Sequence, residues 1–153
     1  MAEHLTSPGG EMDGMDGMQV HLRVSFPGDL NAIAPVVERI MQIAREQKFP
    51  EEKEGEIGLA VQEALVNAVK YGCKNDASKS VHCSVASDSG GAMLIVIRDP
   101  GAGFDPAHLP NPQEGDHIFR DHGRGIFLIN QLMDEVRFER GGTEVRMRKD
   151  NKS

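Results

Sequence analysis

The sequence predicts an α+β fold in which a mixed, mostly antiparallel sheet carries its helices on one face. The first observation is the order of patterned segments, which runs strand, helix, helix, two strands, loop, helix, two strands. The second is that both later strand pairs are separated by glycine turns, at 87–91 and 140–142. With 153 residues, 39% hydrophobic and 27% charged, the chain has the composition of one globular domain. We place this domain at 18–149, between a disordered leader at 1–17 and a flexible tail at 150–153.

The first ordered elements are a strand and a helix. Apolar residues alternate with polar ones from Val20 to Phe26, as a half-buried strand requires. Asp29 is suited to cap a helix that ends near Lys48. The apolar stripe of this helix consists of Leu30, Ile33, Val37, Ile40, Met41 and Ala44.

A second helix and a hairpin follow. Pro50 ends the first helix, and the acidic run that begins at Glu51 suits the first turn of the next. We expect this helix to end near Lys70, with Gly72 as its C-terminal glycine. Two strands then form the hairpin, at 81–86 and 93–98.

The last third of the chain begins with a long loop. The segment 106–122 contains three prolines and has no clear period, so we predict a lid-like loop there. A short helix at 125–133 and a final strand pair at 136–138 and 143–147 complete the domain.

Charge and composition restrict the class of partner. The net charge is -7, and no basic cluster interrupts it, which argues against binding to nucleic acid or anionic membranes. No apolar stretch is long enough to span a membrane, and no signal peptide is visible, so we expect a cytoplasmic protein. Cys73 and Cys83 are expected to be free and non-catalytic thiols. A basic or mixed-charge protein partner fits this composition better.

The second helix carries a narrow polar stripe. Its other faces are apolar, through Ile57, Leu59, Val61, Ala64, Leu65, Val66, Ala68 and Val69. The stripe consists of Glu56, Glu63, Asn67 and Lys70, which stack on successive turns. The Asn67 oxygen can ligate a hard cation such as Mg²⁺, and Glu63 can accept a proton from a nucleophile. The alternative is a solvated helix edge, and Lys70 in particular is either a phosphate or partner contact or a solvated charge.

Two glycine-containing segments follow this helix. Asp99, Gly101 and Gly103 come directly after a buried strand, where a carboxylate can accept a hydrogen bond from the exocyclic amine of adenine. Taken alone, this segment is equally consistent with an ordinary tight turn. The segment 122–126, His-Gly-Arg-Gly-Ile, lies at the start of a predicted helix, where free backbone N–H groups bind phosphate oxygens. Its spacing matches neither a P-loop nor a Rossmann turn.

In this order, the three segments resemble the N box and the two glycine boxes of the GHKL ATPases, which include gyrase, histidine kinases and MutL. The resemblance covers roughly residues 18 to 149. The small size, the compact lid and the segment 123–136 are most similar to the anti-sigma factor serine kinases. These proteins hold a sigma factor and phosphorylate a serine on its antagonist. The resemblance implies a two-layer α/β sandwich of the Bergerat type.

The resemblance also implies a role for each motif residue. Glu63 is the implied general base, and Asn67 the implied Mg²⁺ ligand. Asp99 is the implied adenine-reading carboxylate. The other implied nucleotide contacts are Gly101, Gly103, Gly123, Arg124, Gly125 and Thr143, with Arg124 also assisting catalysis at the phosphates. We also expect nucleotide contacts from Lys70 and Ile126. The chain departs from the family at Tyr71, where many relatives have histidine, and it shows no sensor or phosphoacceptor-helix domain.

We therefore expect an ATP-dependent serine protein kinase and anti-sigma factor that uses ATP and Mg²⁺. Its expected partners are a sigma factor and an anti-anti-sigma protein of the STAS type, and the resemblance implies a homodimer. One alternative is a nucleotide-gated binding protein of the same fold with little or no kinase activity. Another is a small globular domain without a ligand. We expect no metal site at His117 and His122, because a third close ligand is missing.

Overall fold

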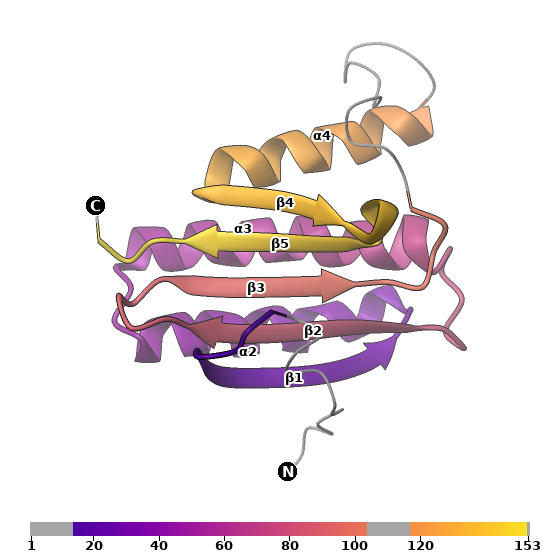
Figure 1. Cartoon of the computed structure of the whole chain (residues 1–153). Coiled ribbons are helices and arrows are strands. Elements are labelled where there is room, and N and C mark those ends of the chain that lie inside the picture. Colours follow the sequence, from indigo (N-terminus) through magenta and orange to yellow (C-terminus); the bar gives the residue numbers. More distant parts are fainter. Residues whose placement is uncertain (1–13, 104–116, 153) are drawn as a thin grey trace.

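The computed structural model describes residues 14–103 and 117–152 of the chain, and the side chains of 117–122 lie outside this description. Five antiparallel strands form one sheet in the order β1-β2-β3-β5-β4, and the helices cover one of its faces (Figure 1). The predicted α+β class is confirmed. The elements are β1 (Gln19–Pro27), η1 (Leu30–Ala32), α2 (Ile33–Glu46), α3 (Glu51–Asn67), η2 (Ala68–Gly72), β2 (Ser80–Ser87), β3 (Met93–Arg98), α4 (His117–Leu132), β4 (Glu135–Glu139), η4 (Arg140–Gly142) and β5 (Glu144–Lys149).

The core lies between the sheet and the helical layer. The strand register places Ile95 of β3 opposite both Val85 of β2 and Met147 of β5, so their side chains share the helix-facing side. These residues are buried together with Ile57 and Val61 of α3. Each such side chain contributes about 1.5–3 kcal/mol through burial. This packing fixes α3 across the middle of the sheet.

The first helix begins differently from the prediction. The Asp29 side chain accepts a hydrogen bond from the Asn31 N–H at 3.0 Å, but the turn that it caps is the 3₁₀ turn η1. The predicted stripe residue Leu30 lies in this turn and is 47% exposed, because the tighter turn rotates it away from the face that α2 buries. The rest of the predicted stripe packs against the core, with Ile33, Val37, Ile40 and Ala44 buried and Met41 partly buried.

The second helix ends in a π-helical turn. Of the predicted apolar set, Leu59 is 45% exposed and Val66 is only partly buried, and the other members are buried. The α-helix ends at Asn67 rather than near Lys70, and η2 continues it with a π hydrogen bond from the Cys73 N–H to the Ala68 carbonyl at 2.8 Å. A π turn contains one more residue than an α turn, so it changes which side chains face the sheet after Asn67.

The third helix begins earlier than predicted. Of the predicted loop at 106–122, residues up to 116 lie outside the described part of the chain, but α4 already begins at His117. No proline or glycine occurs between residues 117 and 122, so nothing in that stretch prevents helix formation. Gly123 and Gly125 therefore lie in the second and third turns of α4.

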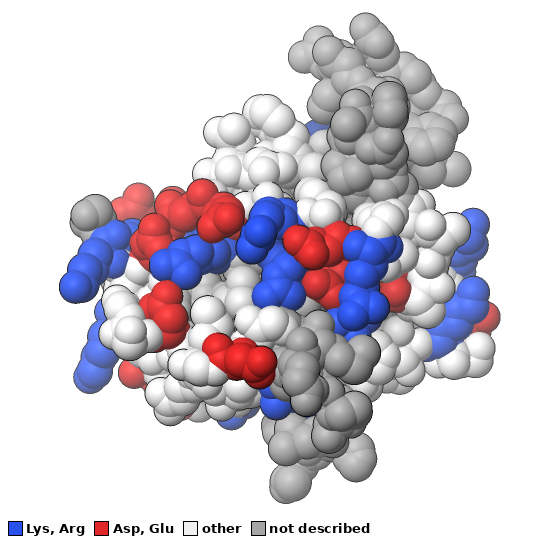
Figure 2. Space-filling view, in the orientation of Figure 1, with Lys and Arg blue, Asp and Glu red and all other residues white. Residues whose placement is uncertain are grey.

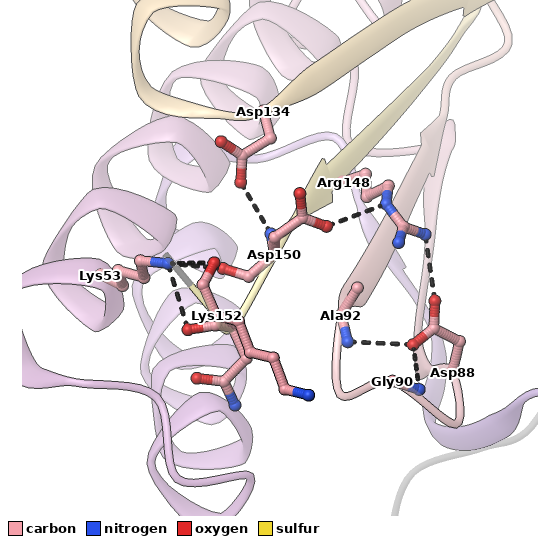
Figure 3. A network of polar contacts seen from close by, with 9 residues as sticks. Lys53, Asp88, Gly90, Ala92, Asp134, Arg148, Asp150 and Lys152 are labelled. Atoms are coloured by element: carbon pink, nitrogen blue, oxygen red, sulfur yellow. Dashed lines mark hydrogen bonds and ion pairs between the residues drawn. The ribbon is translucent and has the colours of Figure 1, made fainter.

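The described residues at both ends of the predicted domain contact the rest of the fold. Residues 1–13 of the predicted leader lie outside the described residues, but Met15 is only 2% exposed and packs with Ala86 and Val96. At the other end, the Lys53 ammonium donates hydrogen bonds to the carbonyl oxygens of residues 150, 151 and 152 at 2.9, 3.1 and 3.2 Å (Figure 3). Among the described helices, none is long and apolar enough to cross a membrane.

Candidate functional site

A cavity opens between α3, α4 and the adjoining ends of β3 and β5. Its walls are mainly apolar, from Ala64, Ile97, Ile126, Ile129, Phe138 and Val145. Its polar groups include Asn67, Tyr71, Asp99 and Thr143. Residues from all three predicted motifs therefore meet in one cavity.

Asp99 is the only carboxylate among the described residues that line this cavity. Its backbone N–H donates to the Thr143 carbonyl at 2.9 Å, and its Oδ1 accepts a hydrogen bond from the Gly101 N–H at 2.7 Å. Its Oδ2 has no hydrogen-bond partner within the described part of the chain. Burial raises the pKa of Asp99, and the bond from Gly101 opposes this shift. The carboxylate is thus fixed by one oxygen and offers the other as an acceptor.

Gly72 and Gly101 allow the π turn to pack directly on Asp99. A Cβ atom on Gly72 would lie 2.5 Å from Oδ1 and 2.6 Å from the Cβ of Asp99. A Cβ atom on Gly101 would lie 2.8 Å from the Cα of Gly72. Neither position therefore has room for a side chain. The sequence identified Gly72 only as a helix end, although its place within the N-box segment was a signal for a role in the site.

Gly103 and Thr143 lie together at the same end of the cavity. Gly103 has φ of +85°, and a Cβ atom there would clash with the Gly141 carbonyl and lie 3.3 Å from Cγ2 of Thr143. The Thr143 hydroxyl donates to the Arg140 carbonyl at 2.9 Å. Glycine is required at 103 both by its left-handed backbone and by this close approach.

Glu63 and Asn67 belong to the α3 side of the site, where they lie against Gly125 of α4. A Cβ atom on Gly125 would lie 3.1 Å from Oε1 of Glu63 and 3.2 Å from Nδ2 of Asn67. The glycine therefore lets the α4 backbone approach a carboxylate and a carboxamide that lie one turn apart on α3. The next residue, Ile126, lines the cavity.

Six of the predicted site residues do not line the cavity: Glu63, Lys70, Gly101, Gly123, Arg124 and Gly125. Gly123 is buried within α4, and Arg124 is exposed. The Lys70 ammonium lies 5.7 Å from the centre of the Tyr71 ring, a cation–π distance, while the Tyr71 side chain lines the cavity. The prediction that residues 122–125 begin a helix was wrong, so the argument from free N–H groups at a helix start does not apply to Gly123 and Gly125.

Glu56 of the polar stripe has a structural role instead. It forms an ion pair with the Lys149 ammonium at 2.8 Å, and Lys149 also donates to the Leu132 carbonyl at 2.5 Å. These contacts join α3, the end of α4 and β5 at the far end of α3 from Asn67. The alternative of a solvated helix edge is therefore incorrect for Glu56, which has a charged partner.

Glu63 and Asn67 provide too few ligands to hold a metal ion alone, but they suit a metal ion that is also bound by the phosphates of a nucleotide. Among the side chains that the structure describes, at 14–103 and 123–152, no group of three or more His, Cys, Asp or Glu is arranged to hold a metal ion. Mg²⁺ in nucleotide sites is usually held by one or two protein oxygens and by the phosphates. The Asn67 carboxamide next to Glu63 fits that arrangement.

Comparisons with known proteins agree with this geometry. The family model described as histidine kinase-like ATPase domain matches residues 26–149. Serine-protein kinase RsbW of Staphylococcus epidermidis is 37% identical over 84 residues, which are 51% of this chain and 53% of that protein. Anti-sigma F factor of Priestia megaterium is 30% identical over 91 residues, 55% of this chain and 58% of that protein. The chain thus spans about half the length of the curated relatives that it matches.

Solved structures show the same fold. The blue-light activated histidine kinase of Erythrobacter litoralis EL346 superposes with a TM-score of 0.54 at 23% identity, covering 78% of this chain and 42% of that chain. Its histidine kinase domain gives a TM-score of 0.52 at 24% identity, covering 82% and 61%. Together with the sequence matches, these findings confirm the resemblance inferred from the three motifs. The chain belongs to the histidine kinase-like ATPase domain family.

Proposed function

We propose that the protein is an ATP-dependent serine protein kinase that acts as an anti-sigma regulator. The observation that carries this proposal is one cavity lined by both Asp99 and Asn67, with Glu63 next to Asn67 against Gly125 of α4. Asp99 suits recognition of a base, and Asn67 with Glu63 suits a phosphate chain. The printed names of the relatives, a serine-protein kinase and an anti-sigma factor, support the same function.

Base recognition depends on the ionised form of Asp99. Its Oδ2 accepts a hydrogen bond from the exocyclic amine of adenine, while Oδ1 remains bonded to the Gly101 N–H. The flat base lies between the apolar walls near Thr143 and Gly103. A guanine base presents a carbonyl oxygen where adenine has its amine, so the same carboxylate rejects it. This contact gives the site its preference for ATP.

Phosphoryl transfer depends mainly on Glu63. The substrate serine oxygen attacks the γ-phosphorus, Glu63 accepts the proton of that hydroxyl, and ADP leaves with the bridging oxygen. Asn67 would hold Mg²⁺, which supplies charge neutralisation at the phosphates when it is bound. Arg124, Gly123 and Lys70 lie outside the cavity lining, and we assign them to the phosphates that extend beyond it.

The proposed protein partners follow from the relatives. We assign a sigma factor as the bound target and an anti-anti-sigma protein of the STAS type as the phosphorylated substrate. The homodimer implied by the family resemblance stays a prediction. The alternative function is a nucleotide-gated binding protein of the same fold without kinase activity, and the exposed position of Arg124 outside the cavity is the observation that favours it.

Substitution of Glu63 by glutamine separates these two functions. The neutral amide cannot accept the serine proton, so we expect transfer from labelled ATP to the STAS-type protein to fall by roughly 10²–10⁴-fold. Binding of Mg-ATP should stay close to that of the wild type. Glu52→Gln, an exposed change in the first turn of the same helix, is the matched control. Normal transfer by Glu63→Gln would refute the general-base assignment, and ATP binding by the wild type without transfer would favour the alternative.

A further inference from the structure

The carboxylate of Glu144 is buried on the outer face of the sheet, opposite the helices. Glu144 is the first residue of β5, and its neighbour Val145 lines the cavity, so the Glu144 side chain points to the other face. This side chain is only 3% exposed. Figure 2 views the molecule from the outer face and shows acidic side chains with basic ones beside them across the sheet. A carboxylate is almost never buried without partners, so the contacts of Glu144 indicate its role.

Three arginines contact this carboxylate. Its Oε1 accepts hydrogen bonds from Nε and Nη2 of Arg98 at 3.1 and 2.8 Å. The same oxygen lies 3.1 Å from Nε of Arg140. Oε2 accepts a hydrogen bond from Nη1 of Arg146 at 3.2 Å. Both oxygens of the buried carboxylate are thus paired with guanidinium groups.

Two of these arginines adjoin the cavity. Arg98 is the last residue of β3 and directly precedes Asp99. Arg140 begins the turn η4, and Thr143, which lines the cavity, directly follows this turn. The two segments also meet through the backbone, since the Asp99 N–H donates to the Thr143 carbonyl at 2.9 Å. Glu144 therefore joins, from the outer face, the two segments that carry Asp99 and Thr143.

The turn η4 has a backbone that needs support. Arg140 has φ of +55°, a left-handed conformation that is strained for a residue with a side chain. Gly141 and Gly142 follow with φ of +70° and +95°, so the whole turn is left-handed. Strain of this kind persists only where the surroundings hold it. The contacts that hold Arg140 include its ion pair with Glu144 and the hydrogen bonds that its carbonyl accepts from the Thr143 N–H and hydroxyl, at 3.4 and 2.9 Å.

The position of this turn determines the shape of the cavity beside Asp99. The Gly141 carbonyl lies so close to Gly103 that a Cβ atom on Gly103 would clash with it. Gly142 and Thr143 line the cavity. Relaxation of the turn would therefore move the wall beside Asp99, but it would not move α3, which carries the residues that we assign to Mg²⁺ and to proton transfer.

We propose that Glu144 is a positioning residue for adenine recognition. From the face opposite the cavity, its carboxylate holds Arg140 in the left-handed conformation and thereby keeps the turn against Asp99 and Gly103. The proposal rests on the proposed binding of an adenine nucleotide, and it adds a residue that does not touch the nucleotide. Loss of the ion pair should weaken selection of the base, whereas the contacts to the phosphates remain. A residue that served only the stability of the fold would not change the preference between two bases.

Titration of the full chain with Mg-ATP and Mg-GTP tests this proposal. Glu144→Gln removes the buried charge, and Arg140→Gln breaks the same ion pair from a side chain that is 46% exposed, so this second variant is expected to fold. The matched controls are Glu54→Gln and Arg45→Gln. They break a similar pair of a buried carboxylate and an exposed arginine, which joins α2 and α3 at 2.5 Å. Urea unfolding of all four variants measures the loss of stability separately.

We expect the preference for ATP over GTP to fall several-fold in both Glu144→Gln and Arg140→Gln. The two controls should lose stability but keep the preference of the wild type. An unchanged preference in either Glu144→Gln or Arg140→Gln would overturn the proposal, and so would an equal fall in the controls. Equal weakening of ATP and GTP binding would also overturn it. If the wild type bound ATP no more tightly than GTP, the proposed adenine recognition would fail first, and this proposal with it.

Discussion

Replacing Gly72 with alanine should weaken ATP binding by displacing Asp99. The added methyl group would lie 2.5 Å from Oδ1 and 2.6 Å from Cβ of Asp99, well inside van der Waals contact. The carboxylate is held on its other side by the Gly101 N–H at 2.7 Å, so it has little room to yield. The substitution must therefore move either the π turn or the carboxylate itself.

The structure sets the size of this effect. Loss of a hydrogen bond to a charged acceptor costs about 1.5–3 kcal/mol, which corresponds to a roughly 10- to 150-fold weaker Kd for Mg-ATP. Overpacking at a buried contact costs a further 1–3 kcal/mol, roughly, in the free energy of unfolding. GTP, which does not engage Asp99 in the same way, should lose much less affinity. Selectivity for adenine is thus expected to fall together with affinity.

Isothermal titration of Mg-ATP and Mg-GTP measures this change. Gly55→Ala is the matched control, because Gly55 lies on the same helix with no atom within 4 Å of an added Cβ. That control should keep its ATP affinity and gain about 0.8–1 kcal/mol in stability from helix propensity. If Gly72→Ala binds ATP as tightly as Gly55→Ala does, then Asp99 does not read the base in the way described here.

Three further predictions concern other parts of the molecule. Gly125→Ala places a methyl group 3.1 Å from Glu63 and 3.2 Å from Asn67, so single-turnover phosphoryl transfer should fall more than ATP affinity, and an equal fall would contradict this. Lys53→Met removes the donor shared by three carbonyls, so urea unfolding should show a loss of about 1–2 kcal/mol, and no loss would mean that solvent replaces these bonds. Burial raises the pKa of Asp99 in the folded protein, so folding favours the protonated carboxyl group. The free energy of unfolding therefore falls as the pH rises and the buried carboxyl group becomes ionised. The nucleotide-free Asp99→Asn variant should therefore exceed the wild type in stability near pH 7 but not below about pH 4, as urea unfolding at both pH values would show.

Much of the fold is encoded locally in the sequence. The alternation from Val20 to Phe26 predicts a strand because a sheet with one buried face selects that period. The continuous apolar run from Met93 to Ile97 predicts a central strand, and β3 is buried on both faces. The start of α4 was missed although Asp116, a residue type suited to an N-cap, directly precedes His117 in the sequence, because the prolines before it were interpreted as a loop reaching residue 122. Burial of Met15 was missed because one apolar residue among glycines and aspartates has no period.

The sequence predicted which residues belong to the site, but it did not predict which of them contact one another. The spacing of Glu63 and Asn67 follows from the α-helical repeat, and the structure retains it. The role of Gly72 could not be deduced, since a π turn inserts a residue that a regular repeat does not anticipate. The exposed position of Arg124 also depends on tertiary structure, because the packing of α4 against α3 decides which side chains of α4 are covered.

Thermal unfolding with and without Mg-ATP tests the central claim that the cavity binds an adenine nucleotide through Asp99. At a ligand concentration of 100 times Kd, the free energy of unfolding should rise by about 2.7 kcal/mol. For a domain of this size, that corresponds to a Tm increase of roughly 5–11 °C. We predict this increase for the wild type with ATP and a much smaller one for Asp99→Asn at the same concentration. No increase for the wild type, or an equal increase for Asp99→Asn, would contradict the account.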